Sequence, residues 1–245
     1  MSFYQTGAGR AGKYCVLLGM YLLTIPLQAE KRIIVFVALA DNFWQGIVPV
    51  SMRLGDGDNP ESNLYWGSAD GMQTVFDRSK EWKLVSKSKG DDTGPVLRTR
   101  LYRHKRTGAT LQAMAYRGRN IKNAIADFEA SINDRFDLVV FIGHNGLMDF
   151  SLDLPVKKRV KKSDVIVLGC KSERYFKPRL NALGARPLLL TTQNMYPGAF
   201  ILHAALQSYL AGRDTASIRR SAADAYAKNQ RIGLKPALGV FSVLQ

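Results

Sequence analysis

The sequence predicts one α/β domain, built on a mainly parallel sheet with helices on both faces. Short, continuous apolar runs rich in Val, Ile and Leu are typical of strands that are buried on both faces of a parallel sheet. Segments with apolar residues at helical spacing alternate with these runs, which indicates βαβ units. The chain has 245 residues, of which 46% are hydrophobic and 22% are charged. This length and composition suit a single globular domain with a sizeable core.

The strands are predicted from short apolar or alternating runs. Continuous apolar runs predict buried strands at residues 32–39, 137–142, 165–168 and 187–191. A shorter run and an alternating run predict two more strands, at residues 82–85 and 96–104. Polar, Gly-rich or basic composition predicts loops at residues 41–60, 87–95 and 157–162.

Four helices are predicted from the spacing of apolar residues. They cover residues 64–76, 120–132, 197–210 and 215–229. Asn120 is the expected N-cap of the second helix, because its side chain can accept a hydrogen bond from an unpaired helix amide. Gly212 is expected to end the third helix, as glycine commonly does after the last helical turn.

The N-terminal residues have the composition of a secretory signal peptide. Arg10 and Lys13 precede an apolar run at residues 15–27, and Ala29 supplies a small residue at the expected cleavage point. The run is too short to span a bilayer comfortably. We therefore expect residues 1–29 to be removed on export, to the periplasm or the medium, which leaves residues 30–245 as a domain that is not transmembrane. An uncleaved anchor and a buried first helix are the alternatives.

The formal net charge of +15 favours acidic partners, such as acidic surfaces or cell-envelope polymers. A solvated basic surface is the simpler alternative. No zinc knuckle, helix-turn-helix signature or RNA-recognition motif is visible, so we expect no specific nucleic-acid partner. The acidic turn around Asp56 and Asp58 lacks the later glutamate of a calcium-binding loop, and we expect neither a metal nor a cofactor.

Cleavage after Ala29 would leave a single thiol. Cys15 belongs to the expected signal peptide, so Cys170 is the only cysteine of the mature chain. A lone cysteine in an exported protein cannot form an internal disulfide, and it is either a crosslink between subunits or a reactive group. The position of Cys170 in the fold is therefore informative.

Two successive buried strands run directly into polar motifs, GHNG at residues 143–146 and GCKS at residues 169–172. Ligands of open α/β sheets bind at the carboxyl ends of the strands, and neighbouring strands lie about 4.8 Å apart. A free thiol has a pKa of about 8.5, and a nearby histidine can convert it to the nucleophilic thiolate. Taken singly, each residue is more often structural. Together they predict a catalytic dyad of Cys170 and His144.

The order of these motifs resembles that of the caspase–gingipain–separase group of cysteine peptidases. There an apolar strand ending in His-Gly precedes an apolar strand ending in Cys, and the segment after Cys170 is similar to the end of CHAT-type peptidase domains. The resemblance implies a caspase-like three-layer sandwich and hydrolysis of peptide bonds by the Cys170 thiolate. Here Asn145 separates His144 from Gly146, so either the Asn145 or the Gly146 amide would hold the oxyanion beside the Cys170 amide.

Further residues are candidates for substrate binding. Asp41 closes the first strand, where the resembling peptidases often place a residue that reads the side chain before the scissile bond. A carboxylate there would favour Lys or Arg, and a loop-capping role is the alternative. Asp149 and Asp153 lie just past His144 and would orient it or line the cleft. Ser172 follows Cys170 by two residues and is a further candidate.

The sequence therefore predicts an exported caspase-like cysteine peptidase, a hydrolase that acts on peptides or proteins. Three alternatives stay open. The domain could be a catalytically inactive binding or scaffolding domain of the same fold, or a different hydrolase or acyltransferase that uses the same dyad. It could also be a basic protein that binds nucleic acid or anionic envelope polymers, in which case binding would depend steeply on salt.

Overall fold

The computed structural model describes residues 1–3, 30–91, 93–155 and 162–244. Nearly all of the expected signal peptide and of the expected basic loop at residues 157–162 lie outside these ranges. The described residues form one seven-stranded mixed sheet and six α-helices. None of these helices is both long enough and apolar enough to cross a bilayer.

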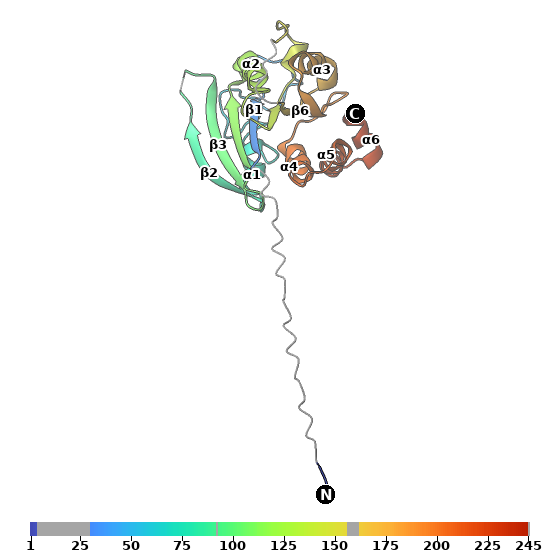
Figure 1. Cartoon of the computed structure of the whole chain (residues 1–245). Helices are drawn as coiled ribbons and strands as arrows, with labels where there is room; N and C mark the ends of the chain where they lie inside the picture. Colours follow the sequence, from blue (N-terminus) through green and yellow to red (C-terminus); the bar gives the residue numbers. More distant parts are fainter. Residues whose placement is uncertain (4–29, 92, 156–161, 245) are drawn as a thin grey trace.

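The sheet is parallel over most of its width and antiparallel at one edge. Its strand order is β2-β3-β4-β1-β5-β6-β7. The strands are β1 (Arg32–Ala38), β2 (Trp82–Lys89), β3 (Val96–His104), β4 (Thr110–Tyr116), β5 (Leu138–Ile142), β6 (Asp164–Leu168) and β7 (Arg186–Leu189). Strands β4, β1, β5, β6 and β7 run parallel, whereas β3 is antiparallel to both β2 and β4 (Figure 1). The prediction of a mainly parallel sheet is confirmed.

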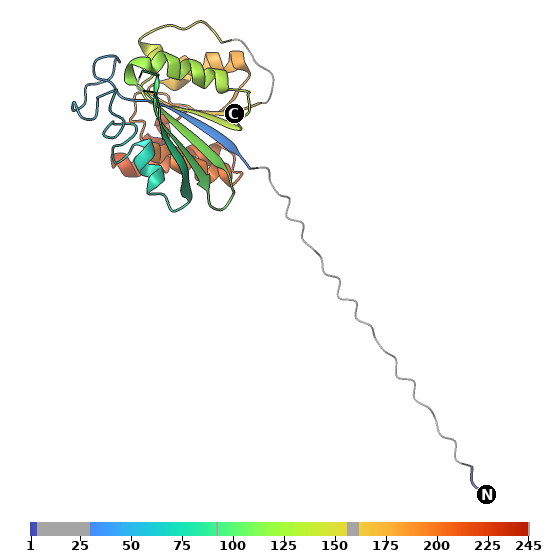
Figure 2. The same ribbon diagram turned by 90° about the vertical axis from the view of Figure 1, so that its left-hand side faces the viewer.

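Helices cover both faces of the sheet, which gives three layers (Figure 2). The helices α2 (Ile121–Ser131) and α3 (Ser172–Leu183) pack on one face. The other face carries α1 (Met72–Asp77), α4 (Ala199–Leu210), α5 (Thr215–Gln230) and α6 (Leu234–Val240). Alternate residues of a strand point to opposite faces. Phe36 of β1 therefore belongs to the core under α2 and α3, and Val35 to the core on the opposite face.

Several elements differ from the sequence-based expectation. The sequence patterns do not indicate strand β4 or helices α3 and α6. The helix expected at residues 64–76 is wrong over its first part, since only Met72–Asp77 is helical. Asn120 does occupy the N-cap position of α2, but its side chain makes no capping hydrogen bond.

The Asn63 side chain explains why the segment before α1 is not helical. Its amide oxygen accepts hydrogen bonds from the backbone N–H groups of Ala40 (3.0 Å) and Tyr65 (3.1 Å). Its amide nitrogen donates to the Ala40 carbonyl (2.8 Å). A side chain that bonds the backbone in this way competes with helix formation. It ties this segment to the carboxyl end of β1, where it becomes part of a cavity wall.

Candidate functional site

The sheet brings His144 and Cys170 to the same edge. Strands β5 and β6 pair in parallel, with Ile142 opposite Leu168. The backbone N–H of Gly143 extends this pairing by donating to the Leu168 carbonyl (3.1 Å). The predicted adjacency of the two strand ends is therefore confirmed. His144 and Cys170 each lie two residues beyond this last pair, so they occupy equivalent positions at the end of their strands.

Glycine is required at the position before His144. Gly143 has φ +145°, a backbone conformation that residues with a side chain rarely adopt. A Cβ at this position would lie 2.7 Å from the Ala38 carbonyl oxygen of the neighbouring strand β1. Gly143 thus lets the chain turn tightly against β1, and this turn fixes where the His144 side chain emerges.

Cys170 and His144 line one cavity of about 420 Å³. Its walls come from five places in the sequence: the loop after β1, the turn that contains Tyr65, and the segments that follow β5, β6 and β7. His144 is almost fully buried, with 5% of its surface exposed, whereas Cys170 is partly exposed. A cavity of this size that contains converging polar groups is the usual form of a small-molecule or peptide site.

Asp149 holds the His144 ring through a side-chain contact. Its Oδ2 lies 2.7 Å from His144 Nε2, and the same oxygen accepts a hydrogen bond from the Gly46 backbone N–H (2.9 Å). An ionised carboxylate only accepts hydrogen bonds, so Nε2 carries the proton and Nδ1 of a neutral ring has the free lone pair. Asp149 thus has the orienting position that the sequence suggests. Among the described residues, the Asp153 side chain has no hydrogen-bond partner.

The Cys170 thiol lies at a sharp turn between β6 and α3. Lys171, which follows it, adopts a left-handed conformation with φ +50°. The thiol is directed toward the Met195 carbonyl oxygen, with Sγ 3.6 Å from it. Within the described residues no hydrogen bond joins Sγ to the His144 ring. The two groups therefore share a cavity without being hydrogen-bonded to each other in this state.

Two backbone amides at the site are available to a ligand. The Gly146 N–H donates to the His144 carbonyl (3.1 Å), whereas the N–H groups of Asn145 and Cys170 donate to no acceptor in the part of the chain that the structure describes. The Asn145 side chain connects the two strand ends, because its Nδ2 donates to the Cys170 carbonyl (2.7 Å). Of the three candidate oxyanion donors, the Asn145 and Cys170 amides thus remain free and Gly146 is occupied.

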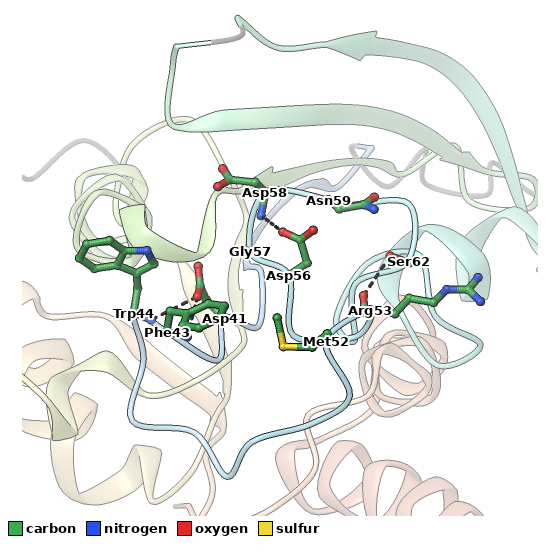
Figure 3. A pocket seen from close by; sticks show the side chains of 10 residues that line it. All are labelled: Asp41, Phe43, Trp44, Met52, Arg53, Asp56, Gly57, Asp58, Asn59 and Ser62. Atoms are coloured by element: carbon green, nitrogen blue, oxygen red, sulfur yellow. Dashed lines mark hydrogen bonds between the residues drawn. The ribbon is translucent and has the colours of Figure 1, made fainter.

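Asp41 lies outside this cavity. It is buried, and its Oδ1 accepts hydrogen bonds from the backbone N–H groups of Phe43 (2.9 Å) and Trp44 (3.1 Å). Figure 3 shows it in a neighbouring cavity of about 540 Å³, together with those two aromatic residues and Asp56. These contacts are those of a residue that caps a loop, which was the alternative to substrate binding. The structure does not bring Asp41 into the cavity of Cys170 and His144.

Ser172 also lies away from the cavity. It is fully buried at the start of α3, where its hydroxyl donates to the Val167 carbonyl (3.0 Å) and lies 3.0 Å from Thr191 Oγ1. The expectation that Ser172 contacts substrate is therefore corrected, since its hydroxyl joins β6, α3 and the end of β7. This junction supports the turn on which Cys170 sits.

Tyr65 is a residue of the site that the sequence patterns do not indicate. It is buried and lines the cavity. Burial, with smaller electrostatic contributions from Cys170 and Tyr196, raises its pKa well above the usual range. Tyr65 therefore stays protonated and offers a hydrogen-bond donor beside the thiol. Nothing periodic in its neighbourhood could have indicated this position, which depends on the turn made by Asn63.

The other two histidines are remote from the thiol and have structural partners. His104 Nδ1 lies 2.9 Å from Thr107 Oγ1, and His203 Nε2 lies 2.9 Å from Ser79 Oγ. No group of three or more His, Cys, Asp or Glu side chains is arranged to hold a metal ion among the described residues.

Comparisons of the chain with protein-family models, curated proteins and solved structures found no match.

Proposed function

We propose that the chain is a cysteine peptidase with a caspase-like fold, in which Cys170 is the nucleophile and His144 is the general base. One observation carries the proposal: the thiol and the imidazole line the same cavity at the carboxyl edge of the parallel sheet, and the Asp149 carboxylate contacts the imidazole. A nucleophile, a base and a group that orients the base are the parts that covalent catalysis of acyl transfer requires.

The reaction proceeds through a thioester. The Cys170 thiol gives its proton to His144 Nδ1, and the thiolate attacks the carbonyl carbon of the substrate to form a C–S bond. The backbone amides of Asn145 and Cys170 stabilise the resulting oxyanion. His144 then returns the proton to the leaving amine as the C–N bond breaks. Water, deprotonated by His144, hydrolyses the thioester and releases a carboxylic acid and the free thiol.

The resting position of the thiol is compatible with this sequence of steps. Sγ points to the Met195 carbonyl and must turn toward His144 when substrate enters. Rotation about one side-chain bond moves a cysteine between staggered positions. Catalytic hydrogen bonds are often long or misaligned before the substrate binds. The lack of a hydrogen bond between Cys170 and His144 among the described residues is therefore consistent with the proposed roles.

Export and a caspase-like fold belong to the same proposal. Export is supported by Arg10 and Lys13, the apolar run and Ala29 in the sequence. The fold is supported by the order of His144 and Cys170 on adjacent parallel strands and by the helices on both faces. Measurement of the intact mass of the protein recovered from the periplasm or medium tests export, because a chain that starts at Glu30 is expected.

The proposed activity is tested by screening a peptide library with the wild type and the variants Cys170→Ala and His144→Gln. Both variants are expected to lose turnover while keeping the wild-type melting temperature. His203→Gln is the matched control, since that histidine lies outside the cavity, and it should keep its activity. Normal turnover by Cys170→Ala would refute the proposal. Labelling of Cys170 by acylating reagents without cleavage of any peptide would favour the hydrolase or acyltransferase alternative instead.

A further inference from the structure

The walls of the cavity that contains Cys170 and His144 are largely apolar. No Asp, Glu, Lys or Arg lines it within the described residues, and His144 is its one basic side chain. The apolar side chains that form the walls are Ile47, Val48, Val50, Leu64, Met148, Met195 and Pro197. Pockets lined in this way bind apolar groups, while a few polar atoms fix the orientation of the ligand.

These walls surround the position that a substrate side chain next to Cys170 would occupy. Val48 and Val50 come from the loop after β1, whereas Met195 and Pro197 come from the segment after β7. Leu64 packs against the core on the α4 side of the sheet and gives the wall a rigid support. The volume of about 420 Å³ is sufficient for a large side chain together with adjoining main chain.

A charged side chain would find no partner in this cavity. Among the described residues no Asp or Glu side chain lines the cavity: Asp41 opens to the neighbouring cavity, and Asp149 is bonded to His144. Moving an unpaired ammonium or guanidinium group from water into an apolar site is strongly unfavourable. An apolar side chain gains free energy from the same transfer.

We propose that the substrate residue whose carbonyl Cys170 attacks carries a bulky apolar side chain of the Leu, Met or Phe class. This inference rests on the proposed peptidase function and specifies its substrate. It replaces the preference for Lys or Arg that a carboxylate at Asp41 would imply. Val48 is the residue through which the preference can be changed without disturbing the core, since it is 87% exposed at the rim of the cavity.

The test uses peptidyl chloromethyl ketones that are identical except for a terminal Leu, Phe, Lys or Arg. Alkylation of Cys170 is followed by intact mass in the full chain with Cys15→Ser, and each rate constant is divided by that for iodoacetamide, which carries no side chain. We expect the Leu and Phe reagents to react about 100-fold faster than the Lys and Arg reagents, a typical range for discrimination by an apolar pocket.

A paired substitution tests the assignment of the cavity. Val48→Asp places a carboxylate at the rim and should reduce the preference for Leu over Lys by about 2- to 5-fold, the effect of one exposed ion pair. Val243→Asp is the matched control, because Val243 is 75% exposed and does not line the cavity. It should leave the preference unchanged, and an equal change in both variants would contradict the assignment.

The possible failures are distinguishable. A wild-type preference for the Lys or Arg reagents would overturn the inference about the side chain but would leave the proposed peptidase function intact, since peptides would still be recognised. Equal rates for all four reagents, unaffected by His144→Gln, would overturn both. In that case the thiol would react as an ordinary cysteine, with neither a base nor a substrate pocket.

Discussion

Replacing Asp149 with asparagine isolates the contact that orients His144. The substitution keeps the size of the side chain and removes its negative charge. An amide has both a donor and an acceptor, so it no longer obliges Nε2 to carry the proton, as a carboxylate does. His144 can then adopt the tautomer in which Nδ1 is protonated, and this tautomer cannot accept the proton of Cys170.

The size of the effect follows from the geometry. The His144 Nε2 to Asp149 Oδ2 distance is 2.7 Å, and a hydrogen bond to a charged group contributes about 1.5–3 kcal/mol. If this energy is lost in the transition state, the rate falls by about 10- to 150-fold. The Asp149 side chain is 31% exposed. Because solvent weakens such a contact, we expect the lower part of this range, about 10- to 30-fold.

The assay is the second-order rate constant for alkylation of Cys170 by the Leu chloromethyl ketone, with the melting temperature as a test of folding. Asp153→Asn is the matched control, since Asp153 is on the same loop and its side chain has no hydrogen-bond partner within the described residues. The control should react like the wild type. An unchanged rate in Asp149→Asn, or an equal loss in both variants, would show that Asp149 does not orient the base.

Three further predictions concern the fold that supports the site. Gly143→Ala should destabilise the protein by about 1–3 kcal/mol, as strained backbone positions do, and should abolish alkylation that depends on the base; urea unfolding and the alkylation rate measure the two effects. Glu129→Gln should cost about 3–5 kcal/mol in urea unfolding, because it leaves the buried Arg179 guanidinium without its charged partner. Burial lowers the pKa values of His104 and His203. The unfolded state therefore binds more protons below pH of about 6.5, so the free energy of unfolding should fall between pH 7 and 5.5; thermal melting across this range should show a smaller slope in His203→Gln.

The central strands were predictable because each is a continuous apolar run. Strands β1, β5 and β6 are buried on both faces, so every residue is selected for the same property and the pattern is unambiguous. Strand β4 was not predictable in this way, since Gln112 and the two alanines of its TLQAMAY sequence weaken the apolar signal. Its position is set by pairing with β1 and β3.

Helix α3 shows how tertiary contacts override local preference. Its sequence contains Pro178, which favours interruption of a helix, and many charged residues. The helix nevertheless forms, because Phe176, Leu180 and Leu183 fill the core against the sheet. Arg179 is buried as well, and it pairs with Glu129 of α2. A polar helix with a narrow apolar stripe and an internal proline is difficult to recognise without its partners.

Some residues of the candidate site could also be predicted from the sequence, and others could not. The adjacency of His144 and Cys170 could be predicted, since parallel strands that are consecutive in the sequence commonly pair. The contact of Asp149 with His144 was one of two possible roles. Tyr65 and the apolar walls could not be predicted, because they belong to loops that are positioned by long-range contacts such as those of Asn63. Asp41 is a residue for which the sequence suggested the wrong neighbours. Its place at a strand end suggested substrate binding, but its carboxylate accepts hydrogen bonds from the nearby backbone amides of Phe43 and Trp44.

The dependence of Cys170 on His144 is measured by the rate of Cys170 alkylation by iodoacetamide at pH 6.5 and 8.5, in the full chain with Cys15→Ser. An ordinary thiol reacts about 50-fold more slowly at the lower pH, because its thiolate fraction falls. We expect a decrease of less than about 5-fold in the wild type, and the full decrease in His144→Ala. A full decrease in both proteins would show that His144 does not activate Cys170 and would contradict the proposed dyad.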